Sequence, residues 1–244
     1  MKYFFSHKTL GIGNVINCTP MLQSLAKHLN APIPAFIDNP IAKACLKDAP
    51  FLELLDKKPE GDCIFHSRMY IQQKLTLGSY LMPDYEYIWT LGKKLFKYSG
   101  DMPHTYIDTP KALLPFDYVF INGSGCWKKD YLDKKIISND IYRAIANRLE
   151  GSKVVLGSEY CNNPLKFAED LRGSDIREQL GIIASAKMII TNEGGLAHAA
   201  AAMNKPTLIL WKDTEKVKNM NPGTKTFYSF SDYVNDFKKF NQIY

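Results

Sequence analysis

The sequence predicts an α/β protein of two doubly wound domains that face each other across a cleft, each a parallel sheet covered by helices. Three observations support this prediction. Short apolar runs of strand length alternate with stretches whose apolar residues recur at helical spacing, which is typical of β-α-β units. The stretch from Asp101 to Pro115 holds three prolines and little periodicity, and it divides two such series as a linker would. A length of 244 residues suits two small domains.

The first series opens with a short apolar strand and a long amphipathic helix. Pro20 lies near the first turns of that helix, and Gly92 weakens the last helix of the series. Strands are expected at residues 2–5, 35–38, 51–55 and 63–66, and helices at 14–29, 41–46 and 85–98. We assign this series to a reduced first domain at residues 1–112.

The second series comes after the proline-rich stretch. Ser138 or Asn139 is expected to cap one of its helices, and Ser174 or Asp175 another. Strands are expected at residues 118–121, 153–156, 187–191 and 207–211, and helices at 138–149, 165–171, 175–184, 194–203 and 231–243. We assign it to a second domain at residues 113–230, with a C-terminal helix at 231–244 able to pack back on the first.

Composition narrows the class of protein. The net charge of +6 comes from 31 basic and 25 acidic residues, and lysine far outnumbers arginine among the basic ones. This balance permits an anionic partner but is unlike an arginine-rich module that reads duplex DNA. The apolar runs are too short to span a bilayer, and no secretory leader is evident, so stable membrane insertion is not expected. We expect a cytoplasmic protein.

Cysteine usage agrees with that location. The five cysteines are an odd number, are widely spaced and form no Cys-x-x-Cys pair, so neither a disulfide framework nor a zinc site is predicted. They are interpreted as reduced thiols: Cys18, Cys45, Cys63, Cys126 and Cys161.

A glycine turn stands between the first strand and the first helix. Gly11 and Gly13 let a ligand approach the backbone, and the helix that starts beside Asn14 offers N–H groups to an anion. The third glycine of a dinucleotide-binding fingerprint is missing, and Asp38 is the one acid near the end of the second strand. The turn therefore favours an anionic ligand over NAD, although a simple strand-to-helix turn would have the same sequence.

Two loops of the second domain come directly after strand ends, where open α/β sheets bind ligands. Gly123 and Ser124 come after the first strand, and lysines suited to phosphate lie downstream, among them Lys134 and Lys135. No Gly-Lys-Ser/Thr occurs at Walker spacing. Glu159 comes after the next strand, where a carboxylate can accept both hydroxyl protons of a ribose diol. An exposed lysine-rich loop and a solvated glutamate are the alternatives.

The most specific motif runs from Thr191 to His198. A buried strand ends, Glu193, Gly194 and Gly195 turn the chain, and an alanine-rich helix begins with Leu196. The N-terminus of such a helix suits a diphosphate, and His198 lies close enough to donate to a phosphate oxygen. The alternative is a packed histidine.

Taken in order, these segments resemble glycosyltransferase family 9, the heptosyltransferase-like enzymes of GT-B fold. The resemblance covers residues 3–29 and 118–211 well and residues 30–115 poorly. It rests on Gly11-Ile12-Gly13-Asn14 with Thr19-Pro20-Met21-Leu22, on Gly123-Ser124, on Lys134 or Lys135, on Gly157-Ser158-Glu159, on Thr191 to His198 and on Lys205-Pro206-Thr207.

The resemblance implies a nucleotide-diphosphate-sugar donor held by the second domain. It would place Glu159 on the nucleotide ribose and Lys134 or Lys135 on the diphosphate. Residues Glu193 to Leu196 and His198 would line the donor phosphate and sugar, with Gly13, Gly123 and Ser124 nearby. No metal or other cofactor is expected, because lysines and helix N-termini stabilise the leaving diphosphate in such enzymes.

Three departures from the family pattern bear on catalysis. The acid that comes after the family's glycine turn is Asn14 here, and an amide takes no proton at neutral pH. Asn14, Glu193 and His198 remain the candidate catalytic positions, and Asp38, His66 or Glu193 could replace the missing base. Second, the aspartate of the helix-start motif is Glu193. Third, the short first domain suggests an acceptor other than the usual inner-core lipopolysaccharide.

The acceptor stays open between two anionic polymers. One is lipopolysaccharide or another surface glycan, and the other is phage DNA carrying a hydroxymethylated base. The short first domain and a composition rich in Lys, Asn, Ile and Tyr tilt the prediction toward DNA and, if the chain is phage-encoded, toward the host cytoplasm. A base in duplex DNA would have to flip out, and stacking groups would come from Tyr80, Tyr85, Tyr87 and Trp89, unless these residues are core.

Two other classes of protein are alternatives to a glycosyltransferase. The loss of the family's aspartate at Asn14 favours a catalytically inactive nucleotide- or nucleotide-sugar-binding protein. A sugar-nucleotide epimerase would need paired acid and base carboxylates, which the sequence does not place.

Overall fold

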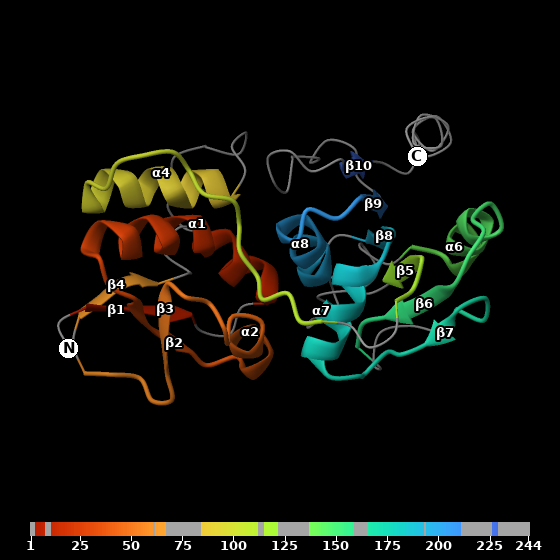
Figure 1. The fold of residues 1–244 in the computed structure, drawn as a ribbon, viewed down its shortest axis with the longest axis horizontal. Helices are drawn as coiled ribbons and strands as arrows, with labels where there is room; N and C mark the ends of the chain where they lie inside the picture. The colour runs from red at the N-terminus through yellow and green to blue at the C-terminus, as the bar shows by residue number, and fades with distance from the viewer. Residues whose placement is uncertain are drawn as a thin grey trace. The chain divides into compact units, whose positions relative to one another are not determined.

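The computed structural model describes residues 3–7, 11–60, 62–66, 84–111, 115–121, 137–158, 165–192, 194–210 and 226–228. The described residues divide into two compact units whose boundary along the chain lies between Asp108 and Thr109 (Figure 1). The sequence places this boundary after residue 112, near the same point. The expected C-terminal helix at 231–244 lies outside the described residues.

Unit 1 is a four-stranded parallel sheet of order β3-β2-β1-β4. Helices α1 and α4 lie side by side along this sheet (Figure 1). The strands are β1 (Tyr3–His7), β2 (Ile33–Ile37), β3 (Leu52–Leu55) and β4 (Asp62–His66), and the helices are α1 (Ile12–Leu29), α2 (Pro40–Ala44) and α4 (Asp84–Phe96). The predicted elements of this half are confirmed within a few residues at their ends.

Gly92 explains how α1 and α4 approach each other. A Cβ atom built on Gly92 would lie 2.5 Å from Met21 Cγ on α1 and 2.7 Å from Tyr98 Oη. Only a glycine fits there without repacking, so the residue that weakens α4 as an isolated helix allows its close contact with α1.

Pro20 lies in the interior of α1 and cannot donate a helical hydrogen bond. Thr19 Oγ1 donates instead to the Ile16 carbonyl at 2.7 Å, which is the carbonyl that Pro20 leaves without its helical partner. The same hydroxyl accepts the backbone N–H of Tyr106 at 2.7 Å. The Thr19 hydroxyl thus replaces the helical hydrogen bond that Pro20 cannot make, and it also binds the backbone of Tyr106, 87 residues further along the chain.

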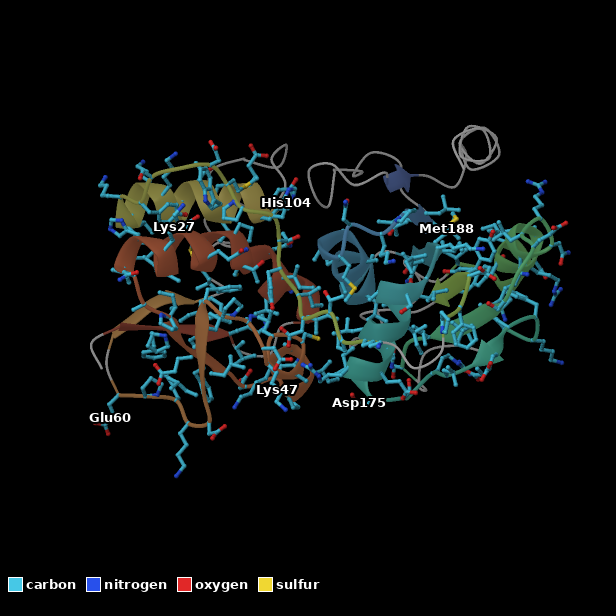
Figure 2. The ribbon with its side chains drawn as sticks, viewed as in Figure 1. Lys27, Lys47, Glu60, His104, Asp175 and Met188 are labelled. Carbon is cyan, nitrogen blue, oxygen red and sulfur yellow. The ribbon has the colours of Figure 1, made fainter. Side chains whose placement is uncertain are left out.

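That segment, residues 101–108, belongs to the stretch predicted as a linker. It has no helix or strand, but several hydrogen bonds tie it to unit 1. The His104 carbonyl accepts Gln23 Nε2 at 2.8 Å, and Asp108 Oδ2 accepts the Asp48 N–H at 2.9 Å (Figure 2 labels His104). This part of the predicted linker is therefore attached to unit 1, through the backbone groups of His104, Tyr106 and Asp108.

Unit 2 is a six-stranded parallel sheet of order β10-β9-β8-β5-β6-β7. Helix α6 lies on one side of it and α7 with α8 on the other (Figure 1). The strands are β5 (Tyr118–Ile121), β6 (Lys153–Leu156), β7 (Glu169–Asp170), β8 (Met188–Asn192), β9 (Thr207–Leu210) and β10 (Thr226–Tyr228), and the helices are α6 (Asn139–Ala146), α7 (Ile176–Ser185) and α8 (Gly195–Ala202).

A hydrophobic core of unit 2 lies between α6 and the sheet. Phe120, Val155 and Ile190 stand in register on neighbouring strands and pack against Tyr142 and Ile145 of that helix. Every residue of β8 is buried, as expected of a central parallel strand covered on both faces. Asp175 caps α7 by accepting the Arg177 N–H at 2.8 Å, while Ser138 precedes α6 without a side-chain cap (Figure 2 labels Asp175).

Two elements of unit 2 differ from the prediction. The helix expected at Leu165–Leu171 is wrong, because Glu169 and Asp170 pair with β6 as an edge strand. Leu165 is buried in the core and the Phe167 ring packs edge-on against Phe120, so packing and the open edge of β6 override local helical spacing. Strand β10 was not predicted.

None of the helices in the described ranges has an apolar stretch of the length needed to traverse a bilayer. Cys18 and Cys45 are buried as thiols, as the sequence predicts.

Candidate functional site

The strand order of unit 2 fixes where a ligand would bind. The chain builds outward in one direction from β5 through β6 to β7, and in the other from β8 through β9 to β10. The point of reversal lies between β5 and β8, and open α/β sheets bind ligands outside the carboxyl ends of the strands at such a point. The carboxyl ends are Ile121 and Asn192, which directly precede two of the predicted motifs.

Helix α8 starts at this point. Gly194 is its N-cap residue, and the Gly194 carbonyl accepts the N–H groups of Ala197 and His198 at 3.1 and 3.2 Å. Gly195 and His198 are partly exposed, and no acidic residue lies in the first turn. Donor groups, a positive dipole end and the absence of a repelling charge in that turn suit an anionic ligand.

The alanine run of α8 sets how closely the helix approaches the sheet. Ala197, Ala199 and Ala200 are fully buried, and α8 packs against β8, β9 and α7. Small side chains permit this close packing, which fixes the helix axis relative to the strand ends. His198 is the polar residue in this run and is partly exposed.

Tyr142 of α6 connects the two strand ends. Its hydroxyl is fully buried and donates to the Ile121 carbonyl at 2.7 Å. Burial raises the pKa of Tyr142 well above its usual value, and a hydrogen bond with the Asn192 backbone partly opposes this increase. The hydroxyl is thus neutral at physiological pH and links the last residues of β5 and β8.

Gln179 of α7 holds the turn after β6. Gly157 has φ +126°, a conformation that favours glycine, and its N–H donates to Gln179 Oε1 at 3.1 Å. Gln179 Nε2 donates to the Gly157 carbonyl at 3.4 Å and to the Ser174 carbonyl at 2.8 Å. Because Gln179 is only 5% exposed, water cannot readily replace these bonds. The turn leads directly into Ser158 and the predicted Glu159.

The equivalent point of unit 1 lies between β1 and β4, where α1 begins. Gly11 precedes the helix without a side-chain cap, Gly13 is buried, and Asn14 is partly exposed in the first turn. That turn contains no acidic residue. The structure therefore places Asn14 at the start of α1, as the motif predicts, with an amide at the position of the family's acid.

Several predicted site residues lie outside the described residues and stay predictions: Gly123, Ser124, Lys134, Lys135, Glu159 and Glu193. The described ones fall into two groups. Gly194, Gly195, Leu196 and His198 lie together at the start of α8, whereas Gly13 and Asn14 lie at the start of α1.

The remaining candidates lie in unit 1. Asp38 is exposed after β2, and its N–H donates to the His7 carbonyl at 3.2 Å. The backbone of His66 pairs with Ser6 at the end of β4. Tyr85 and Tyr87 are buried, which makes them core residues rather than stacking groups. Trp89 Nε1 donates to Ser24 Oγ at 3.0 Å within the same unit.

Sequence reasoning missed Tyr142 and Gln179. Gln179 left one signal, because it interrupts the apolar stripe of α7 as a polar residue at helical spacing from Ile176 and Ile183. Tyr142 left none, since a tyrosine among isoleucines is an ordinary core residue. Over the described ranges, no cluster of three or more metal-ligating side chains is present.

Comparison with known proteins agrees with this geometry. A family model described as glycosyltransferase family 9 (heptosyltransferase) matches residues 174–238, which include α7, β8, α8 and β9. No curated protein sequence matches the chain.

Solved structures match over nearly the whole chain. A family 9 glycosyltransferase from Veillonella parvula superposes with a TM-score of 0.64 at 12% identity, covering 98% of this chain and 91% of that one. The E. coli heptosyltransferase WaaC, solved with ADP-2-deoxy-2-fluoro heptose, gives 0.61 at 12% identity, covering 98% and 99%. E. coli ADP-heptose lipopolysaccharide heptosyltransferase II gives 0.61 at 13% identity, covering 94% and 89%.

These likenesses show an α/β fold of the GT-B type, and with it the predicted fold class is confirmed. The family model matches the segment that carries the α8 motif, so the resemblance to glycosyltransferase family 9 is confirmed as well. The chain is thus similar to heptosyltransferases in its fold and, over residues 174–238, to the family 9 model.

Proposed function

We propose that unit 2 binds a nucleotide-diphosphate sugar and that the chain transfers its sugar to a hydroxyl of an anionic glycan. The observation that supports this proposal is the N-terminus of α8 at the point where the strand order of unit 2 reverses, with His198 on its first turns. Helix N–H groups and the dipole stabilise the charge that develops on a departing diphosphate.

The ligands of the matching structures suggest which sugar donor to test. Two of the matching structures hold ADP or an ADP-heptose analogue, and a dodecameric heptosyltransferase, TibC, was solved with ADP-D-β-D-heptose. ADP-heptose is therefore the first donor to test, ahead of UDP-, GDP- and CMP-sugars.

The reaction breaks the bond between the sugar's anomeric carbon and the diphosphate oxygen and forms one to the acceptor oxygen. Glu193 to Leu196 with His198 would hold the diphosphate and sugar, Lys134 or Lys135 with Gly123 and Ser124 would complete the phosphate site, and Glu159 would bind the ribose. The acceptor proton needs a base, and the Asn14 amide cannot serve. Asp38, His66 and Glu193 are the candidates.

For the acceptor we propose a lipopolysaccharide or another surface glycan, because one matching enzyme is described as acting on lipopolysaccharide. No contact among the described residues favours hydroxymethylated DNA, the acceptor toward which the composition tilts. DNA is therefore retained as an outcome of the experiment.

The test supplies purified protein with each nucleotide sugar and two acceptors, truncated lipopolysaccharide and a duplex containing hydroxymethylated bases, with and without EDTA. Mass spectrometry then measures the product. Sugar on the glycan supports the proposal, and sugar on the DNA replaces the proposed acceptor. Loss of product with EDTA would contradict the expected metal independence.

A second candidate is a nucleotide-sugar-binding protein without transferase activity, and the amide of Asn14 in the first turn of α1 favours it. Donor binding without transfer or hydrolysis would support this candidate. If Asn14→Asp then produced turnover, the missing carboxylate would be the cause.

A further inference from the structure

One buried polar side chain in unit 2 is not explained by packing alone. Tyr142 lies on α6, beneath the sheet, with no exposed surface. Its ring contacts Phe120 edge-on, with ring centroids 6.1 Å apart, which a phenylalanine would do equally well. A hydroxyl placed in such a core lowers stability unless it is hydrogen-bonded, so its partners decide what it contributes.

Both partners are backbone groups at the ends of the two central strands. The hydroxyl donates to the Ile121 carbonyl at 2.7 Å and also hydrogen-bonds the Asn192 backbone. Strands β5 and β8 are paired in parallel, and Ile121 pairs with Thr191, so Asn192 lies one residue beyond the last ladder pair. The tyrosine therefore holds the β8 backbone just where its ladder with β5 stops, while on its other side Asn192 still pairs with Leu210 of β9.

Helix α8 starts directly after Asn192. Gly194 is two residues further on, so its Cα lies within about 7.6 Å of that of Asn192. Thr191 Oγ1 donates to the Asn192 carbonyl at 2.7 Å, which is a further side-chain hydrogen bond to the same residue. The position of Asn192 thus limits where the first turn of α8 can lie.

We propose that Tyr142 is a positioning residue for the diphosphate site, its hydroxyl fixing the end of β8 so that the N-terminus of α8 is preorganised. This inference rests on the proposed function, because it assigns the α8 N-terminus to the donor diphosphate. A role restricted to the stability of unit 2 is the alternative, and it predicts no difference between ligands with and without phosphates.

The variant is Tyr142→Phe, which keeps the ring in the core and removes one oxygen. Its matched control is Tyr118→Phe, which removes the same oxygen from a half-buried tyrosine at the opposite end of β5. Calorimetry or competition measures the affinity of each protein for ADP and for adenosine. Partial unfolding weakens both ligands by the same factor, so the ratio of the two affinities is independent of the folded fraction.

We expect the ratio of ADP to adenosine affinity to fall about tenfold in Tyr142→Phe and to stay within about twofold in Tyr118→Phe, the size of one hydrogen bond's effect. An unchanged ratio in Tyr142→Phe would overturn the inference. If the wild type binds neither ADP nor any other nucleoside diphosphate, the proposed function fails instead.

A second measurement needs no ligand. Amide hydrogen exchange compares residues 192–198 with the rest of unit 2 in the two variants. Faster exchange confined to residues 192–198 in Tyr142→Phe supports the positioning role. Unchanged exchange there, or an equal increase over all of unit 2, overturns it.

Discussion

Both units bring a helix N-terminus to the point where their strand order reverses, yet they treat that point differently. In unit 2, Tyr142 and Gln179 hydrogen-bond the backbone at the strand ends, so buried side chains of the protein fix the site. In unit 1, Ser6 Oγ at the end of β1 and Asn17 Oδ1 on α1 are buried without a hydrogen-bond partner in the described part of the chain.

The difference bears on the proposed transfer reaction. A charged leaving group needs donors that are already oriented when the bond breaks, because reorganising them costs energy at that moment. Unit 2 meets this requirement with side chains that are almost fully buried. In unit 1 the long-range hydrogen bonds lie away from the strand ends. They attach residues 101–108 to α1 and to the region of α2. Unit 2 thus differs from unit 1 in that buried side chains hold the backbone next to its proposed ligand site.

Among the substitutions that test this difference between the units, Gln179→Leu is expected to have the largest effect on stability. The substitution leaves the N–H of Gly157 and the carbonyl of Ser174 without their buried partner, whereas the Gly157 carbonyl still accepts the Gly173 N–H at 2.9 Å. We expect the free energy of unfolding of unit 2 to fall by about 3 kcal/mol, measured by urea denaturation. Gln179→Glu should also lose stability, because it keeps an acceptor for the Gly157 N–H but places a buried carboxylate against the Ser174 carbonyl. A loss below about 1 kcal/mol in the leucine variant would show that the turn is held by other contacts.

Thr19→Val tests the hydrogen bonds that attach residues 101–108 to α1 in unit 1. Removing the hydroxyl leaves the Ile16 carbonyl and the Tyr106 N–H unpaired. We expect a loss of about 2 kcal/mol in the free energy of unfolding and earlier proteolysis of residues 101–108. Thr19→Ser is the control, since it retains the oxygen. Equal stability of the valine variant and the wild type would contradict the assignment.

His198→Ala and Glu193→Ala test the site itself. We expect His198→Ala to weaken ADP binding about tenfold, the value of one hydrogen bond to a charged group. Glu193→Ala should weaken binding or turnover of the nucleotide-sugar donor, and neither variant should change the thermal midpoint much. His104→Ala is a matched control, because His104 is exposed in unit 1 and only its backbone carbonyl is used (Figure 2). Wild-type donor affinity in both site variants would show that the diphosphate binds elsewhere.

The smallest effect concerns pH. Asp117 forms an ion pair with Lys187 and accepts hydrogen bonds from Ser152, and these contacts hold the pKa of Asp117 below its ordinary value. A carboxyl with a lowered folded-state pKa stabilises the protein above its unfolded pKa, and that stability is lost as the pH falls through the folded-state pKa. The stability difference between wild type and Asp117→Asn should therefore be present at about pH 7, shrink below about pH 4 and decrease in high salt. A difference that stays constant with pH would contradict this role.

Prediction from sequence succeeded where the signal was local. The Gly194-Gly195 turn and the alanine run gave α8 to within a residue at each end, and alternating apolar stretches gave β5 and β6 at their observed bounds. It failed for β7, because the apolar residues Leu165, Ala168 and Leu171 recur at helical spacing and predicted a helix there. An edge strand two residues long has no period that a sequence could show.

The sequence by itself determined the two α/β series, the order of their elements and the glycine turns before α1 and α8, because strand and helix periodicity and glycine's freedom act over a few residues. It also determined that position 14 carries an amide rather than an acid. Only the tertiary structure decided which buried polar groups hold the site. Tyr142 meets Ile121 and Asn192 across 21 and 50 residues of chain, and a hydrogen bond over that separation leaves no local pattern.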